Sequence, residues 1–188
     1  LTACGPKEPP VALAAPHPLD ARPTAGAPPA WTPPAPETMS LANGTEAWLL
    51  TRDDLPLVSV RLWIPGGTIA DPAAHPGLTR LSDGLLLHGA GQRDAAAFAS
   101  HSEQLAIDLE VSTWEQGTVV SLDCHADRLN EGLDLMADMV LRPRFDEVDV
   151  TRERDLQIAE IERDLDDPRT VASLVSNRLW YGEAHPAA

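Results

Sequence analysis

Residues 77–89 read GLTRLSDGLLLHG, and their pattern predicts a short amphipathic helix opened by Pro76-Gly77 and closed by Gly89. Its apolar side carries four leucines, at positions 78, 81, 85 and 86. Arg80, Asp83 and Gly84 are spaced i, i+3 and i+4, so they point the same way on the polar side. Whatever these three positions do, they do together.

Strands are expected on both sides of this helix. Residues 40–54 and 55–71 predict a pair of strands, the first announced by the turn signal Asn43-Gly44. Asp94 is a suitable N-cap for a second helix over 95–106. Around Gln116-Gly117, residues 107–116 and 118–126 alternate apolar with polar residues, which predicts a hairpin. Three further helices are expected over 127–142, 145–167 and 169–180, the last two separated at Pro168.

This order of elements predicts an α+β fold in which an antiparallel sheet is covered by helices on one side. The core is expected to include Cys124 as a buried free thiol. It is also expected to include one apolar stripe from each of two helices, namely positions 129, 133, 136 and 140, and Leu156, Ile158, Ile161 and Leu165.

The composition of the chain excludes several classes of function and structure. The 188 residues carry a formal net charge of −15, which disfavours binding to nucleic acid and electrostatic binding to an anionic lipid surface. No apolar run approaches the roughly 18 to 20 residues that a membrane-spanning helix requires. Only two cysteines are present, so a disulfide framework is excluded.

The first residues differ from the rest of the chain. LTAC, residues 1–4, resembles the end of a bacterial signal peptide with its lipobox, which predicts lipidation of Cys4. Residues 5–38 are rich in Pro and Ala and predict an extended linker, since 11 of the 18 prolines lie before residue 37. We therefore expect a lipoprotein of the bacterial cell envelope, anchored in a membrane and facing the periplasm or the exterior.

Six segments follow one another over residues 39–188: LANG, LPLVSVRLWIPGGTIAD, GLTRLSDGLLLHGA, LDLMADMVLRPRFDE, RERDLQIAEIERDLDDP and LWYGEAHP. In this order and with these intervals they resemble the N-terminal domain of the insulinase and pitrilysin family of zinc peptidases, which includes the mitochondrial processing peptidases. The resemblance implies that the sequence is a truncated domain, because the family pattern continues into further strands and helices.

The active motif of that family departs from its pattern here. Active members carry His-x-x-Glu-His in the first helix, with two zinc-binding histidines and a glutamate as general base. The resemblance places Arg80, Asp83 and Gly84 at these three positions, and Glu160 at the family's third zinc ligand on a later helix. Glu153 matches an acidic position one heptad earlier. Because arginine and glycine do not ligate zinc, we expect no metal and no cofactor here, although active members bind zinc.

The positive charge of Arg80 suggests that this side chain takes the place of the zinc cation. Our hypothesis is that its guanidinium pairs with Asp83 at i, i+3 and also lies close to Glu160, holding both carboxylates in a buried network. The alternative is a single exposed pair between Arg80 and Asp83 that contributes well under about 1 kcal/mol.

Three functions follow as expectations. The first is a peptidase homologue that is inactive by itself and pairs with a zinc-bearing homologue, or with a second half-domain, to form a chamber around unfolded peptides. The second is an active zinc peptidase with an atypical ligand set, such as Asp83, Glu160 and a histidine. The third is an envelope lipoprotein that binds peptides or acts as a scaffold, using an acidic cleft for cationic segments.

Overall fold

The computed structural model describes residues 26, 30–52, 54–182 and 185. Cys4, the lipobox and most of the expected linker lie outside the described residues. The contacts within the chain divide it into two compact units, residues 1–51 and residues 52–188, which are described one at a time.

The described residues of the first unit form a small hairpin. Strands β1 (Glu37–Ser40) and β2 (Glu46–Leu49) pair antiparallel. Asn43-Gly44 lies in the turn between them, where Asn43 Oδ1 accepts from the Thr45 amide at 3.0 Å and Gly44 has a φ of 85°. The turn signal in the sequence therefore marks the tip of this hairpin.

A three-stranded antiparallel sheet organises the second unit. Its strands are β3 (Leu57–Pro65), β6 (Asp108–Thr113) and β7 (Gly117–His125), in the order β3-β7-β6. The expected hairpin is confirmed, because β6 and β7 pair from Asp108↔Asp123 to Thr113↔Thr118. The expected pairing of the strand before residue 54 with the strand after it is wrong: β2 pairs with β1, whereas β3 pairs with β7.

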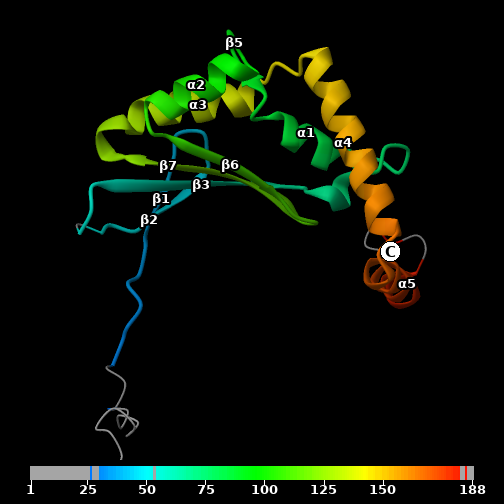
Figure 1. Cartoon of the computed structure of the whole chain (residues 1–188). Coiled ribbons are helices and arrows are strands. Elements are labelled where there is room, and N and C mark those ends of the chain that lie inside the picture. Colours follow the sequence, from blue (N-terminus) through cyan, green and yellow to red (C-terminus); the bar gives the residue numbers. More distant parts are fainter. Residues whose placement is uncertain (1–25, 27–29, 53, 183–184, 186–188) are drawn as a thin grey trace, which may run out of the picture. The chain divides into compact units, whose positions relative to one another are not determined.

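Helices α2 (Ala95–Gln104) and α3 (Leu129–Leu141) lie side by side over one face of this sheet (Figure 1). Asp94 caps α2 as expected, with Oδ1 accepting from the Ala97 amide at 2.8 Å. Between α1 (Leu78–Leu85) and α2 runs the short hairpin of β4 (Gly89–Ala90) and β5 (Arg93–Asp94). The buried core forms between sheet and helices from Leu86, Ala90, Phe98, Ile107, Val120, Leu122, Cys124, Leu135, Met136 and Met139.

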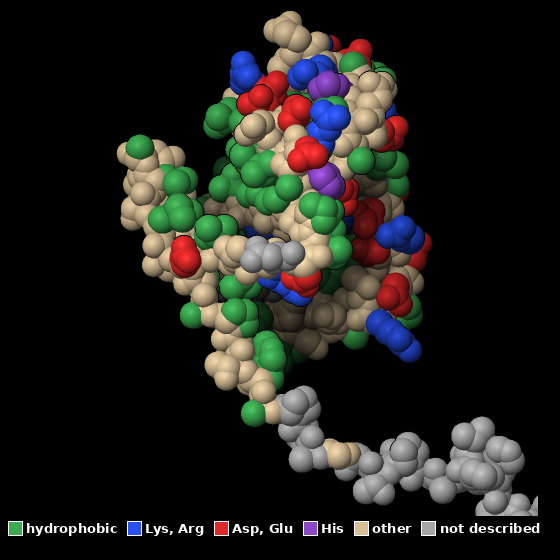
Figure 2. All heavy atoms as spheres, turned by 90° about the vertical axis from the view of Figure 1, so that its left-hand side faces the viewer, with side chains coloured by type: hydrophobic (Ala, Val, Ile, Leu, Met, Phe, Trp, Pro, Cys, Tyr) green, Lys and Arg blue, Asp and Glu red, His purple; other side chains and the backbone are tan. Residues whose placement is uncertain are grey.

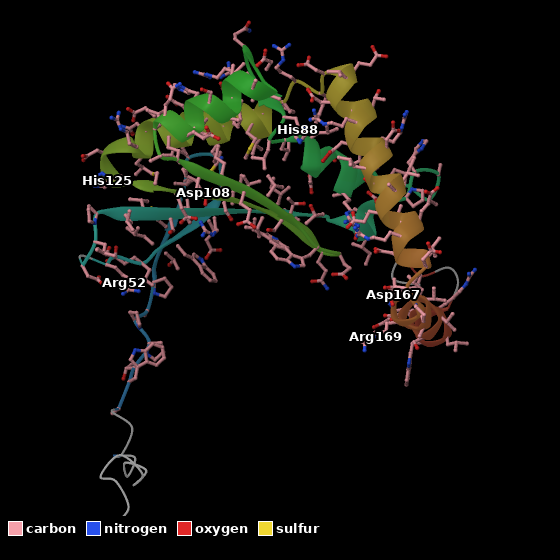
Figure 3. The ribbon with its side chains drawn as sticks, viewed as in Figure 1. Arg52, His88, Asp108, His125, Asp167 and Arg169 are labelled. Atoms are coloured by element: carbon pink, nitrogen blue, oxygen red, sulfur yellow. The ribbon has the colours of Figure 1, made fainter. Side chains whose placement is uncertain are left out.

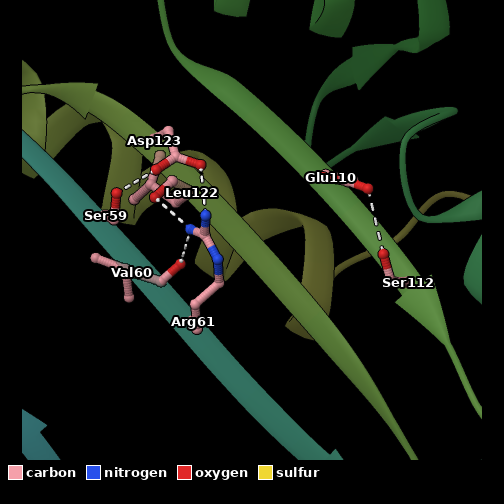
Figure 4. Close-up of polar contacts among 7 residues, drawn as sticks. All are labelled: Ser59, Val60, Arg61, Glu110, Ser112, Leu122 and Asp123. Carbon is pink, nitrogen blue, oxygen red and sulfur yellow. Dashed lines mark hydrogen bonds and ion pairs between the residues drawn. The ribbon is translucent and has the colours of Figure 1, made fainter. Parts of the chain in front are cut away.

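The other face of the sheet carries polar side chains beside the exposed Leu57 and Trp63. Arg61 of β3 donates from Nη2 to Asp123 of β7 at 2.9 Å, and Ser59 donates to the same carboxylate (Figure 4). On the edge strand, Ser112 donates to Glu110 at 3.2 Å. The hydrogen bonds from Ser59 and Arg61 hold the pKa of Asp123 below its ordinary value. One apolar and one polar face are typical of an antiparallel sheet covered on one side.

The remaining helices pack in series, and only the first of them packs closely against the sheet. A 3-10 turn, η2 (Thr68–Ala70), leads into α1 (Leu78–Leu85), which contacts both β6 and α4 (Glu147–Leu165). Another, η3 (Ala126–Arg128), joins β7 to α3. Helix α5 (Pro168–Tyr181) begins at the proline that was expected to break the long helix, and Asp167 caps it. Among the described residues, no helix is both long and apolar enough to cross a membrane.

The α+β fold with helices on one side of the sheet is confirmed, but the apolar stripe expected to bury α4 in the core is wrong. Leu156, Ile158, Ile161 and Leu165 of α4 are all exposed. Helix α4 contacts α1 and α5 rather than the sheet, so its apolar stripe does not reach the core. The stripe expected on α3 is confirmed at Met136, which is buried, and at Leu129 and Val140, which pack against the core, whereas Leu133 is exposed. Gly132, Leu135 and Met139 of this helix are also buried. On the face in Figure 2, acidic and basic side chains lie interspersed, with no patch of a single sign.

Candidate functional site

A pocket of about 580 Å³ lies where α1, α4 and the edge strand β6 meet. Helix α1 contributes Arg80 and Gly84, and α4 contributes Glu153 and Glu160. The structure therefore brings these four positions, which are far apart in the sequence, around one pocket. Its other walls are Thr68, Leu81, Val111, Thr113, Trp114, Glu115, Leu156 and Gln157.

Asp71 fixes the start of α1 and hence the position of Arg80. Its carboxylate accepts from the Gly77 amide at 2.7 Å, from the Thr79 amide at 2.9 Å and from the Thr79 hydroxyl at 2.6 Å. Partial burial acts to raise the pKa of Asp71, but these hydrogen bonds outweigh it and hold the pKa below its ordinary value. Gly77 has a φ of 86°, a left-handed conformation that favours glycine.

Arg80 reaches across the pocket to α4. Its Nη2 donates to Glu160 Oε2 at 2.6 Å, and Arg163 Nη2 lies 3.5 Å from the other oxygen of that carboxylate. The side chains of Arg80 and Glu160 are 54% and 38% exposed. Glu160 is thus held by two arginines, in an ion pair open to solvent rather than in the buried network that we expected.

Asp83 does not join this pair, and the expected contact between Arg80 and Asp83 is wrong. Its Oδ2 accepts from the Thr113 hydroxyl at 2.9 Å and also from the Thr118 hydroxyl. Thr118 is buried, so its hydroxyl needs a partner within the protein. Asp83 satisfies it, and the carboxylate at the family's general-base position joins α1 to the hairpin β6–β7.

Gly84 lies against Glu153 and leaves room for a Cβ. A Cβ at this position would lie 3.8 Å from Oε1 of Glu153, which is an ordinary van der Waals distance. Glu153 in turn lies 3.9 Å from Nε2 of His88, which follows α1 and lies beside α4 (Figure 3). Position 84 therefore contributes no side chain to the pocket, although neither the backbone conformation nor the space around it requires a glycine.

These residues do not fit a zinc ion. The guanidinium of Arg80 is a cation with no lone pair to offer, and it engages Glu160, the one residue that matches a family ligand. Asp83 is committed to two threonine hydroxyls. Within the described part of the chain, no three His, Cys, Asp or Glu side chains come together in a way that could hold a metal ion.

Three contacts at the site were not predicted from the sequence. Thr113 and Thr118 stand opposite each other in the hairpin, so the expected register could have placed them together, but not beside Asp83. Asp71 precedes Gly77 by six residues, outside the usual N-cap spacing. The third contact joins His88 to Arg152, and it depends on how α4 packs against α1.

The chain is similar in sequence to known proteins. The family described as "Insulinase (Peptidase family M16)" matches residues 49–184. A probable mitochondrial-processing peptidase subunit beta of Arabidopsis thaliana is 24% identical over 130 residues, which are 68% of this chain and 24% of that protein.

Two solved structures have a similar fold. A peptidase M16 inactive domain from Pseudomonas fluorescens superposes with a TM-score of 0.77 at 28% identity, over 81% of this chain and 37% of the other. Pitrilysin superposes with a TM-score of 0.66 at 24% identity, over 81% of this chain and 16% of the other. The present chain thus spans only a minor part of the length of each of these relatives.

Proposed function

Because the chain belongs to the insulinase family of peptidases, M16, we propose that it is a non-catalytic member that works together with an active, zinc-bearing homologue or half. The observation that carries this proposal is the ion pair between Arg80 and Glu160. It puts a permanent cation against the residue that matches the third zinc ligand. With Gly84 at the position of a second histidine, the described residues offer no set of three ligands.

Pairing with a second half is the role that such a chain retains. Members of this family typically combine two domains or subunits. The neighbour from Pseudomonas fluorescens is described as an inactive domain, and the Arabidopsis relative is described as one subunit of a peptidase. In this proposal, the chain contributes a wall of the chamber, and the partner contributes the zinc.

An extended peptide is the ligand that best suits the pocket. The order β3-β7-β6 puts β6 at the edge of its sheet, and Val111 and Thr113 of this strand line the pocket. An unpaired strand edge offers N–H and C=O groups to an extended backbone. Glu115 and Glu153 also line the pocket and would favour segments with cationic side chains.

The cell envelope is the proposed location. Lipidation of Cys4 would anchor the chain, and the proline-rich residues 5–38 would hold the folded part away from the membrane. Labelling of cells with a radioactive fatty acid tests the anchor, since the label should be lost in a Cys4→Ser variant. Label that persists in this variant would contradict lipidation at Cys4.

Co-purification of the tagged chain tests the pairing. We expect a stable complex with a protein that carries His-x-x-Glu-His, and we expect this complex to cleave unfolded peptides in a chelator-sensitive way. The isolated chain should not cleave them. A Glu160→Gln variant is the matched control, because it removes the retained family ligand and should not abolish cleavage by the complex, whose zinc comes from the partner.

The other outcomes decide between the remaining functions. Chelator-sensitive cleavage by the isolated chain, lost in Glu160→Gln, would overturn the proposal in favour of a zinc peptidase with an atypical site. Tight binding of cationic peptides by a chain that forms no complex would instead establish a peptide-binding scaffold.

A further inference from the structure

His88 lies in a cluster of charged groups at the junction of α1 and α4, outside the positions compared with the family motif. Its Nδ1 is 2.6 Å from Arg152 Nη2 and 3.7 Å from Asp149 Oδ1, and its Nε2 is 3.9 Å from Glu153 Oε1. Among the described residues, these three side chains are the charged groups that contact the ring, and all three come from α4.

The arginine dictates the protonation state of this arrangement. Arg152 is always charged and can only donate, so Nδ1 of His88 must be the acceptor of this contact. The imidazole is therefore neutral and carries its hydrogen on Nε2, directed toward Glu153. Arg152 also lies 2.8 Å from Asp149, whose side chain is 8% exposed and needs a cation beside it.

A proton on His88 would make this arrangement untenable. With a hydrogen on Nδ1, the ring can no longer accept from Arg152, and two cations would stand in contact. Asp149 and Glu153 are both close enough to receive the two N–H groups of the charged ring after small movements. Arg152 is 53% exposed, so it can turn into solvent at little cost.

We propose that His88 is an acid-operated switch at the junction of α1 and α4. When neutral, its Nδ1 accepts from Arg152. When protonated, it releases Arg152, takes over Asp149 and draws in Glu153. Histidine is the side chain that ordinarily changes charge between pH 5 and 8.

The switch bears on the pocket through Glu153. This side chain lines the pocket and lies beside Gly84, so its movement toward His88 removes a negative group from the wall formed by α4. The inference concerns the pocket of the proposed function but does not depend on it. The test below uses no peptide and no partner, so either idea can fail alone.

Imidazole ¹⁵N NMR of the full chain tests the switch across a titration from pH 8 to pH 5. At pH 8 we expect His88 to carry its hydrogen on Nε2. On acidification, the backbone amide signal of Gly84 should shift with the same midpoint as the ring of His88. In an Arg152→Gln variant, we expect the midpoint to move to higher pH, because the repelling cation is gone.

His125→Gln is the matched control, since His125 lies on β7, contacts Asp127 and should leave the titration of His88 unchanged. Three results would overturn the proposal. These are a hydrogen on Nδ1 of His88 at pH 8, a midpoint that Arg152→Gln leaves in place or moves to lower pH, and a Gly84 signal that does not follow the ring.

Discussion

The ion pair between Arg80 and Glu160 is exposed to solvent, and this exposure limits how much it stabilises the fold. Both side chains are more than a third exposed, so water screens the attraction between them. The pair matters for the site because it occupies the carboxylate that matches a metal ligand. It contributes little to the stability of the fold.

We predict that Arg80→Ala lowers the free energy of unfolding by less than about 1 kcal/mol, the range of exposed ion pairs. Urea unfolding of Arg80→Ala, Glu160→Gln and the double variant measures the coupling between the two side chains. A loss of several kcal/mol in the single variant that vanishes in the Glu160→Gln background would instead establish a buried network.

Asp83 is predicted to contribute more to the stability of the fold than Arg80 does. Asp83→Ala leaves the buried hydroxyl of Thr118 without its acceptor, which costs about 1–3 kcal/mol. Thermal unfolding checks this, with Thr118→Val as the matched background in which the cost of Asp83→Ala should shrink. An equal cost in both backgrounds would show that the threonine contact is not the cause.

Asp71 makes the stability dependent on pH. Its pKa is lower in the folded protein than its ordinary value, so the charged carboxylate stabilises the fold above that ordinary pKa. This contribution should disappear as the pH falls through the lowered pKa of the folded state. We predict that Asp71→Asn is less stable than the parent at pH 7 and that the difference fades in acid. A difference that persists unchanged at low pH contradicts this assignment.

At the scale of helices and strands, substitution by alanine is predicted to have opposite effects on stability at two glycines. Gly117 begins β7, where a Cβ would overlap the ring of Trp63 and lie 2.7 Å from the carbonyl oxygen of Ile64. At Gly84, within α1, a Cβ would make only ordinary van der Waals contact with Glu153. Glycine in the middle of a helix costs about 0.5–1 kcal/mol relative to alanine.

We therefore predict that Gly117→Ala destabilises the protein by at least about 1–3 kcal/mol through overpacking. Gly84→Ala should be neutral or stabilising by up to about 1 kcal/mol. Chemical denaturation of the two variants in parallel checks both. Similar losses in both variants would mean that the space beside Gly84 is needed by the fold.

Local signals predicted most of the elements. The helix around Arg80 and the cap at Asp94 follow from spacing and capping chemistry that act within a few residues. The break at Pro168 and the β6–β7 hairpin have equally local causes. The partners of β2 and β3 could not be predicted in this way, because strand pairing depends on contacts far apart in the sequence.

At the scale of the whole molecule, the apolar stripe of α4 shows what sequence periodicity cannot predict. It predicted an apolar face on this helix but not what covers that face, and Leu156 and Ile161 are exposed. The same limit applies to the site. Family resemblance placed Arg80 beside Glu160, whereas Asp83 followed the hairpin threonines, which no helical spacing could reveal.

The central claim is that this member of the insulinase family holds no zinc. The decisive measurement is the zinc content of the purified chain after dialysis against a small excess of zinc. An Arg80→His, Gly84→His double variant is the positive control, because with Glu160 it restores three ligands and should bind about one zinc per chain. We predict a content near zero for the natural sequence. A content near one zinc per chain, lost in Glu160→Gln, would contradict the account.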